Sequence, residues 1–361
     1  MRKFKYLFGF FKYYSRFVIK TPRIIPRVVS GYFKTIVLKK NVLRAVEIAL
    51  TYDCNSKCSM CSCAKMHKKG ESILSLSEIK SIGKEANKLG AVLFIITGGE
   101  PTLRKDLYEI IKALNPEKNI ISIVTNGLVL NQKKIFKLKE AGLNTIEFSL
   151  ESDVASENDA IRGVPGHFAK VMESIRYAKE AKLNVGLSMV VTHNNFKLFR
   201  KMVKFARKLD AFLLLVCAGI VGRWDSKNEL RINDNDWKKI EKIIRANPFV
   251  RGDFSVNFSG KVGCPAGNER IYISSYGDVL SCALNQISFG NIRKESLEKI
   301  WHRITKFPYY KKRNCYCLRT LNNDYIKRYL DPIKLYPSEP ISIFEHPEIK
   351  ALKRLPKWLK K

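Results

Sequence analysis

Three cysteines stand within eight residues of one another, at Cys54, Cys58 and Cys61. Thiolates at this spacing can ligate three irons of a cubic iron–sulfur cluster and leave the fourth iron open, as a catalytic site requires. A zinc loop is the alternative interpretation, with Cys63 or His67 as the fourth ligand. The spacing favours iron–sulfur binding over zinc.

A glycine turn follows the next apolar run along the chain. Residues 91–97 lead into Gly98-Gly99-Glu100-Pro101, and glycine allows the backbone to approach a ligand closely. The cysteine loop and the Gly-Gly-Glu-Pro turn, in this order, resemble the radical S-adenosylmethionine (SAM) superfamily. The resemblance covers residues 45–320 and implies a [4Fe-4S] cluster on three cysteines, with SAM on the open iron. It also implies cleavage of SAM to methionine and a 5′-deoxyadenosyl radical that takes hydrogen from a substrate.

The resemblance assigns a set of SAM contacts at the ends of successive strands. Glu100 suits the SAM amino group as an acceptor, and Arg162 can pair with the SAM carboxylate. Met60 stands where the family usually has an aromatic residue against adenine, and Glu151 stands where Asp is commoner. The expected set is Met60, Gly98, Gly99, Glu100, Thr125, Asn126, Ser149, Glu151 and Arg162. No further catalytic residue is assigned.

Four more cysteines come late, at Cys264, Cys282, Cys315 and Cys317. Together with the Gly-Asn-Ile and Ile-Trp sequences over 290–301, they resemble the SPASM/twitch extension of radical SAM enzymes. Four cysteines can complete one auxiliary [4Fe-4S] cluster, which points to the shorter twitch form. A structural zinc ribbon is the alternative.

Three other residues near these motifs have open interpretations. Cys63 is either a bystander in the cluster loop or a proton or thiol donor. Cys217 ends an apolar strand and is expected in the core, although its strand-end position also allows it to face substrate. Arg223, in the loop that follows, could bind an acidic group of a substrate.

The elements that must position these residues alternate along the chain. Apolar, β-rich runs occupy residues 45–51, 91–97, 120–125, 145–150, 184–191 and 211–216, and helical patterns occupy 76–89, 103–114, 132–141, 168–181 and 196–209. Nearly continuous apolar strands separated by helices predict a parallel sheet covered on both faces. The pattern predicts an α/β fold, either an open sheet or a barrel, with its chemistry at the carboxyl ends of the strands. The resemblance to the radical SAM superfamily implies a partial (β/α)6 TIM-type barrel.

The rhythm changes after residue 222. A helix over 233–245 and a hairpin of 271–275 with 279–283 predict a small cysteine-bearing α+β domain. The expected organisation is a basic N-terminal arm (1–43), a radical SAM core (44–235), a SPASM/twitch-like domain (236–320) and a basic C-terminal tail (321–361).

Charge says more about partners than about fold. The chain has 66 Lys and Arg against 33 Asp and Glu, and residues 1–46 hold twelve basic residues and no acid. Residues 1–20 form an amphipathic pattern with an aromatic face opposite a basic one, typical of interfacial membrane helices. Packing of that helix on the barrel, or binding of RNA phosphates, are the alternatives. No apolar run approaches the roughly 18 residues of a membrane span.

We therefore expect a radical SAM enzyme that modifies a peptide or protein or performs a net two-electron oxidation. Radical modification of a membrane lipid or lipid-linked substrate, tRNA modification, and a non-enzymatic metal-binding protein are the alternatives. The expected electron donor is a flavodoxin or ferredoxin. The expected location is the cytoplasm, with an anionic membrane surface at its inner face as a possible partner.

Overall fold

We describe the fold from a computed structural model of the chain. The described residues are 21–225, 227–252, 255–256, 262–311, 316–334, 336 and 339–359. The predicted amphipathic helix over 1–20 and the predicted ligand Cys315 lie outside them. Among the described residues, no helix is long and apolar enough to cross a bilayer.

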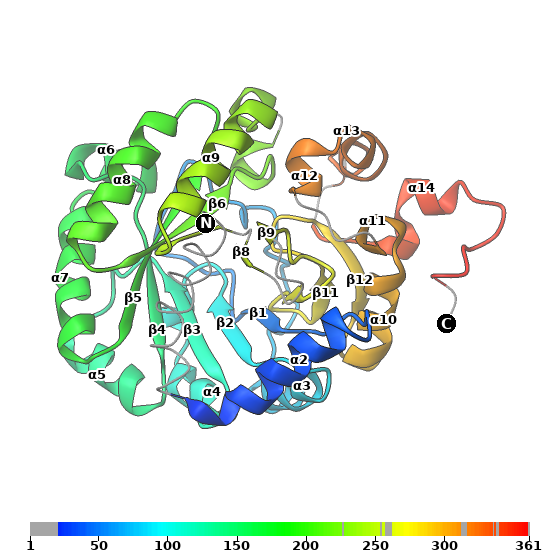
Figure 1. The fold of residues 1–361 in the computed structure, drawn as a ribbon, viewed down its shortest axis with the longest axis horizontal. Coiled ribbons are helices and arrows are strands. Elements are labelled where there is room, and N and C mark those ends of the chain that lie inside the picture. The colour runs from blue at the N-terminus through cyan, green and yellow to red at the C-terminus, as the bar shows by residue number, and fades with distance from the viewer. Residues whose placement is uncertain are drawn as a thin grey trace.

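One sheet runs through the described part of the chain, in the order β13-β12-β11-β10-β1-β2-β3-β4-β5-β6-β7. Its strands are β1 (Ala45–Ala49), β2 (Leu93–Thr97), β3 (Ile120–Thr125), β4 (Thr145–Ser149), β5 (Asn184–Val191), β6 (Phe212–Cys217), β7 (Val250–Gly252), β10 (Arg270–Ile273), β11 (Asp278–Leu280), β12 (Ile287–Asn291) and β13 (Ile341–Ser342). Strands β1 to β7 pair in parallel, in chain order. Figure 1 shows these strands surrounded by an outer layer of helices.

The helices of the outer layer alternate with the strands along the chain, and two of them, α6 and α7, follow β4. They are α3 (Leu76–Lys88), α4 (Leu107–Ala113), α5 (Gln132–Glu140), α6 (Ala155–Arg162), α7 (His167–Glu180), α8 (Phe196–Lys208) and α9 (Asp234–Ala246). Helix α3 begins at a capping box in which the Ser75 hydroxyl accepts from the Glu78 N–H and the Glu78 carboxylate accepts from the Ser75 N–H. Its apolar face then buries Ile79, Ile82 and Ala86.

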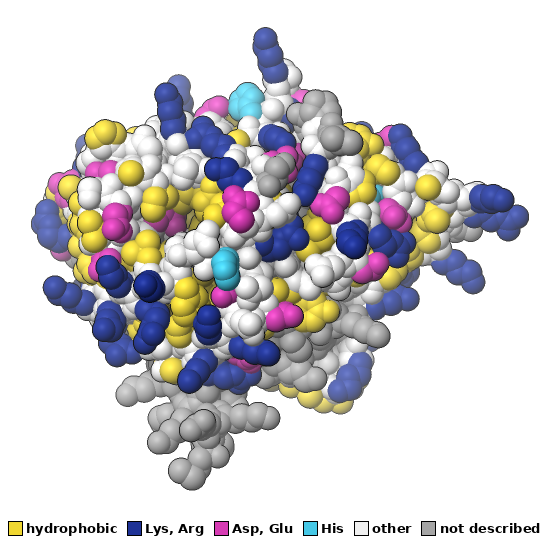
Figure 2. Space-filling view, turned by 90° about the horizontal axis from the view of Figure 1, so that it is seen from above, with side chains coloured by type: hydrophobic (Ala, Val, Ile, Leu, Met, Phe, Trp, Pro, Cys, Tyr) yellow, Lys and Arg dark blue, Asp and Glu magenta, His cyan; other side chains and the backbone are white. Residues whose placement is uncertain are grey.

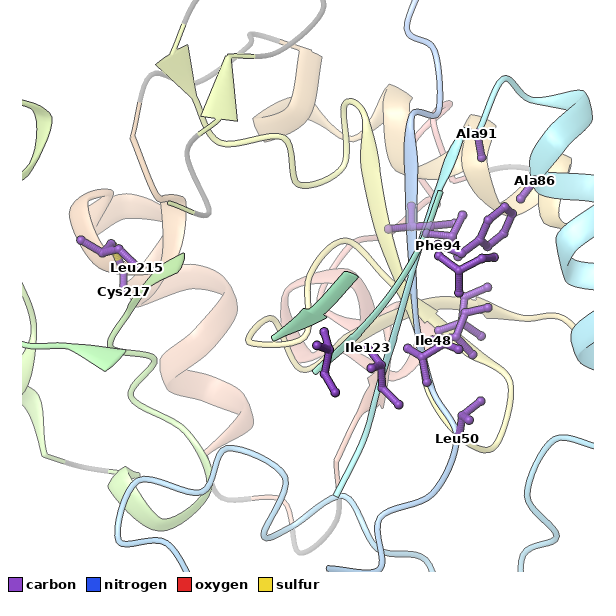
Figure 3. Packing of buried hydrophobic residues seen from close by; sticks show 14 of the residues in the cluster. Ile48, Leu50, Ala86, Ala91, Phe94, Ile123, Leu215 and Cys217 are labelled. Atoms are coloured by element: carbon purple, nitrogen blue, oxygen red, sulfur yellow. The ribbon is translucent and has the colours of Figure 1, made fainter. Parts of the chain in front are cut away.

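Alternation along each strand separates the core from the barrel interior. In β2, Phe94 and Ile96 are fully buried, while Leu93, Ile95 and Thr97 line an internal cavity. Figure 3 shows Phe94 beside Ala86 of α3, with Ile48 and Ile123 from the neighbouring strands. The predicted α/β barrel with a parallel sheet is therefore confirmed.

The later strands extend the same sheet beyond β1. Strand β10 pairs with β1 in parallel, and β11 and β12 continue in antiparallel fashion, which confirms the predicted hairpin. A short hairpin of β8 (Ser255–Val256) and β9 (Val262–Gly263) stands apart. Strand β7 is a seventh parallel strand that the six apolar runs did not include. The predicted limits of 44–235 and 236–320 stay a prediction.

The segment expected as a basic C-terminal tail is packed against the rest of the chain. Strand β13 pairs with β12, and Leu359 is buried. Helices α10 (Leu297–Lys306), α11 (Pro308–Lys311), α12 (Leu318–Leu321), α13 (Asn323–Tyr325) and α14 (Pro347–Lys350) surround this edge. Residues 321–361 contain five prolines. Proline interrupts helices locally, but it does not prevent burial of the apolar residues between the prolines.

Candidate functional site

The cysteine loop lies at the carboxyl end of β1, at the mouth of a cavity of about 360 Å³ inside the barrel. Cys54, Cys58 and Cys61 all line this cavity, and so does Met60. Among the described side chains, no three Cys, His, Asp or Glu converge closely enough to hold a metal ion. The three cysteines expected to ligate the cluster therefore lie on one cavity wall, and their ligand role stays a prediction.

Two later segments of the chain form hydrogen bonds with the backbone of the cysteine loop. The Ser59 N–H donates to the carbonyl of Ile161 in α6 at 3.0 Å. From the 3₁₀ turn Gly222–Trp224, the Arg223 N–H donates to the Cys61 carbonyl at 3.0 Å, and the Arg223 guanidinium donates to the Cys58 carbonyl at 2.9 Å. Arg223 therefore holds the loop, whereas the sequence suggested an acidic substrate group as its partner.

Burial shapes the chemistry of the thiols in the loop. It raises the pKa of Cys54 and of Cys58, while the positive charge of Arg162 acts in the opposite direction at both. Cys63 also lines the cavity, and burial raises its pKa to about 12. Its thiol lies 3.6 Å from the Gly98 carbonyl oxygen.

The glycine turn after β2 fits closely against the start of the cysteine loop. A Cβ at Gly98, whose φ is 139°, would lie 2.2 Å from the Thr51 carbonyl oxygen. A Cβ at Gly99 would lie 2.4 Å from the Asp53 carbonyl oxygen. Since both contacts are with backbone, a larger residue would displace the loop. The glycines are thus needed at this position to seat the loop, and both line the cavity.

Glu100 lies behind the cavity wall and does not line it. Its fully buried carboxylate accepts from the Thr102 N–H at 3.0 Å, the Thr125 hydroxyl at 2.7 Å and the Asn126 N–H at 2.6 Å. Burial raises its pKa, and these hydrogen bonds oppose the shift. The carboxylate therefore joins the end of β2 to the end of β3, which differs from the expected direct contact with SAM.

Asn126 carries this connection on to the cysteine loop. Its side-chain amide donates to Asn55 Oδ1 at 2.8 Å and lies 3.1 Å from the Ser56 hydroxyl. Both Thr125 and Asn126 line the cavity. The predicted residues at the end of β3 are thus brought beside the cysteine loop.

The predicted residues after β4 divide between the cavity wall and its support. Ser149 and Arg162 line the cavity. Glu151 is buried, its carboxylate accepts from the Val190 N–H at 2.9 Å, and Arg162 lies 3.5 Å from it. Burial raises the pKa of Glu151, and Arg162 opposes the shift. Arg162 Nε is buried without a hydrogen-bond partner among the described atoms.

One of the late cysteines lines the same cavity. Cys282, between β11 and β12, lines it together with the first three cysteines. Burial raises the pKa of Cys264 well above its usual value, and the neighbouring Cys317 and Cys282 add to the effect. Cys217 is buried in the hydrophobic core, as expected from its apolar strand.

Sequence reasoning missed the charged side chains of the cavity interior. The lining includes Arg44, Glu47, Glu147, Arg251 and Arg270. The Ser122 hydroxyl of β3 donates to Glu147 at 2.7 Å. The sequence signal was a carboxylate in the middle of each of two strands, Glu47 in β1 and Glu147 in β4. Burial of a charge there costs free energy unless the charge has a polar environment.

Comparisons with known proteins place the chain in a family. Residues 48–206 match the Radical SAM superfamily, and residues 264–319 match an iron–sulfur cluster-binding domain, SPASM. The chain is a radical SAM enzyme with a C-terminal SPASM domain. Its cofactors are accordingly a [4Fe-4S] cluster and SAM, and the SPASM domain implies auxiliary iron–sulfur clusters.

Curated relatives carry two different names. The chain is 26% identical to an AdoMet-dependent heme synthase of Methanosarcina barkeri, over 74% of this chain and 84% of the relative. It is also 26% identical to a PqqA peptide cyclase of Rhodopseudomonas palustris, over 74% of this chain and 75% of the relative.

Among solved structures, the fold is shared with SuiB of Streptococcus suis bound to its precursor peptide SuiA. The TM-score is 0.61 at 19% identity, over 79% of this chain and 69% of SuiB. Native anSMEcpe with bound AdoMet gives a TM-score of 0.56 at 19% identity, over 82% of this chain and 89% of that chain.

Proposed function

We propose that Cys54, Cys58 and Cys61 hold the [4Fe-4S] cluster that binds SAM, and that the substrate is a peptide. The observation that supports this most directly is the meeting of the three thiols with seven of the nine predicted SAM residues on one cavity, all except Glu100 and Glu151. Thiols from a single loop, without carboxylate or imidazole partners, suit iron–sulfur ligation. When bound, the cluster and SAM supply the radical that abstracts hydrogen from the substrate.

Arg162 would bind the carboxylate of SAM. Its side chain lines the cavity beside the cysteine loop, and its buried Nε lacks a hydrogen-bond partner among the described atoms. A buried donor of this kind is costly unless a ligand satisfies it, and a guanidinium is suited to a carboxylate. Glu151 would keep the guanidinium oriented toward the cavity.

The remaining SAM residues would shape and position the pocket. Gly98, Gly99, Asn126 and Ser149 offer close backbone approach and polar atoms on the wall, and Met60 offers an apolar surface for adenine. Glu100 would act through Thr125 and Asn126, since its own carboxylate is occupied by them. It is therefore proposed as a positioning residue.

The auxiliary site would consist of Cys264, Cys282 and Cys317, with Cys315 as the fourth ligand. Because Cys282 lines the same cavity as the first cysteines, a cluster there would lie beside the substrate. It could then accept an electron from a substrate radical, which gives a net two-electron oxidation, or it could anchor the substrate.

Peptide modification is proposed over the alternatives because of the relatives. A PqqA peptide cyclase and SuiB with its precursor peptide are both named for peptide substrates. Lipid or lipid-linked substrates and tRNA remain the competing classes. A flavodoxin or ferredoxin as electron donor and a cytoplasmic location near the inner face of the membrane are further parts of this proposal.

The test is to measure iron and 5′-deoxyadenosine after anaerobic reconstitution. The native protein is expected to carry about eight irons and to release 5′-deoxyadenosine when reduced with SAM. The triple change of Cys54, Cys58 and Cys61 to Ala should leave about four irons and no 5′-deoxyadenosine. Cys63→Ala is the matched control, because it removes a thiol of the same loop and should retain all iron.

Two results would contradict the assignment. If the triple variant kept its full iron content, the three cysteines would not be the ligands. If native, cluster-replete enzyme released no 5′-deoxyadenosine under strong reductant, the radical mechanism would be wrong for this chain.

A further inference from the structure

Helix α2 (Ile25–Ile36) presents an apolar stripe to the outside of the molecule. Its exposed side chains and those that follow it are Ile25, Val29, Phe33, Ile36, Val37 and Leu38, which are between 43% and 60% exposed. Ile25, Val29, Phe33 and Ile36 are spaced by three or four residues and therefore share one helix face. Figure 1 shows α2 (dark blue) on the outside, next to α3 and α4.

The opposite face of α2 is fixed to the barrel, so the stripe cannot turn inward. Gly31 and Thr35 are buried. The Arg27 guanidinium donates to Asn87 Oδ1 at 2.8 Å, to the Ala91 carbonyl at 2.9 Å and to Asn119 Oδ1 at 3.1 Å. An arginine with one partner in α3 and one in each of the segments before β2 and β3 holds the helix in one orientation. The outward direction of the apolar stripe is thus a property of the folded chain.

Basic side chains accompany the stripe. Residues 21–46 contain six Lys and Arg and no acidic residue. Arg23 pairs with Glu117 at 2.8 Å, Arg44 pairs with Glu269 at 3.2 Å, and Arg27 faces the barrel, whereas Lys34, Lys39 and Lys40 are exposed. Apolar side chains beside exposed lysines are typical of helices that lie in the interface of an anionic membrane. Figure 2 shows how widely Lys and Arg side chains spread over one face of the protein, in keeping with a net charge of +33.

Other occupants of the stripe fit this charge less well. A second copy would bring an equally basic α2 segment against the first, and like charges oppose association. Residues 1–20 of the same chain also carry six basic residues and no acid. RNA phosphates would require basic side chains at the centre of the surface, where α2 places apolar ones. An anionic bilayer offers an apolar interior for the side chains of the stripe and negative charge for the basic side chains beside it.

We propose that the outer face of α2 docks the enzyme on an anionic lipid bilayer. This inference goes beyond the proposed radical chemistry and does not depend on it. Because Ala91 and Asn119 immediately precede β2 and β3, Arg27 fixes α2 near the amino ends of the strands. The cysteine loop lies at the carboxyl ends, so docking through α2 leaves the mouth of the cavity uncovered. A substrate in solution retains access to the docked enzyme.

The test compares two double variants of the full chain in co-sedimentation with vesicles. Val29→Ser with Phe33→Ser removes the centre of the stripe. Val154→Ser with Phe136→Ser is the matched control, because these two side chains are about 40% exposed on the surface outside α2. Vesicles contain phosphatidylglycerol and phosphatidylcholine in equal parts, or phosphatidylcholine alone.

The native chain and the control should bind the anionic vesicles equally, and the α2 variant should bind about tenfold or more weakly, since burial of apolar area is lost. Binding by the native chain should fall with salt and be weak on phosphatidylcholine alone. The melting temperatures and 5′-deoxyadenosine release of both variants should match the native chain. This separates docking from the radical chemistry.

Three outcomes would overturn the proposal. The first is equal binding of vesicles by the α2 variant and the native chain. If, in addition, deletion of residues 1–20 abolished binding, that segment and not α2 would dock the enzyme. The second is no binding of the native chain to anionic vesicles at low salt. The third is that the native chain forms a concentration-dependent dimer and does not bind vesicles, while the α2 variant stays monomeric. A second copy of the chain would then occupy the stripe.

Discussion

Glu100 belongs to the Gly-Gly-Glu-Pro motif but lies behind the cavity wall. Its carboxylate receives N–H and hydroxyl donors from the segments that follow both β2 and β3. A buried carboxylate needs such donors to remain charged. The Gly-Gly-Glu-Pro turn therefore connects neighbouring strand ends, and the geometry of the cavity wall depends on this connection.

Replacement of Glu100 by Gln tests this role. The amide group would place donors against Thr125 and Asn126, and hydrogen bonds to a charged group contribute about 1.5–3 kcal/mol each. We expect a lower free energy of unfolding even without SAM, together with weaker SAM binding. Chemical denaturation and SAM titration of the same preparations measure both. Unchanged stability with weakened SAM binding would instead indicate the direct contact that the sequence suggested.

At the scale of elements, the sequence predicted most of what builds the barrel. The six apolar runs became β1 to β6, because buried parallel strands require nearly continuous apolar residues. Helix α6 was missed since its eight residues are mostly polar and bury only Asn158. Helix α2 was missed since its apolar side chains face outward and prolines precede or begin it.

The residues of the candidate site that belong to sequence motifs could be predicted. The residues whose place depends on side-chain orientation or on closure of the barrel could not. The three cysteines, Asn126 and Arg162 lie on one cavity as expected. The position of Glu100 behind the wall depends on which way its side chain turns, and no spacing rule fixes that. The charged interior of the barrel depends on which strand faces point inward, which requires the closed sheet.

One ion pair ties the later part of the sheet to α3 of the core. Arg293, just after β12, donates to Glu78 at 2.6 Å and also to the carbonyl of Ser72 at 3.0 Å. The bond from Arg293 lowers the pKa of Glu78 to about 2, from the ordinary 4.5. Because the folded-state pKa is the lower one, the stabilisation is present above pH 4.5 and is lost as the pH falls toward 2.

The variant Glu78→Gln should remove this contribution and keep the helix start, since Gln also completes a capping box. Both side chains are about 30% exposed, so solvent screening limits the expected loss to about 1 kcal/mol or less at neutral pH. Urea unfolding of native and variant chains at neutral pH and at about pH 3 should show a difference that shrinks in acid. A difference that is independent of pH would point to packing at this contact.

At the scale of the whole molecule, segments distant in sequence complete one another. The cavity brings together residues from the first cysteine loop, from β1 to β7 and from the Cys282 turn. The edge of the sheet is closed in the same way, because β13 covers β12 and the aromatic ring of Trp358 lies 4.9 Å from that of Phe307. The C-terminal segment is thus part of the core that supports the late cysteines.

Trp358→Ala should therefore destabilise the protein. The ring packs edge-on against the buried Phe307, and loss of a partly buried aromatic of this kind costs about 1–3 kcal/mol. Leu355→Ala is the matched control, because Leu355 is 46% exposed and should change stability by less than about 0.5 kcal/mol. Thermal unfolding of the two variants distinguishes a packed segment from a tail. If the segment were an unpacked tail, neither substitution would change the melting temperature. The destabilised variant should also lose iron from the late cysteines before the early ones, because α10, α11 and Phe307 stand next to the former in the chain and in the core.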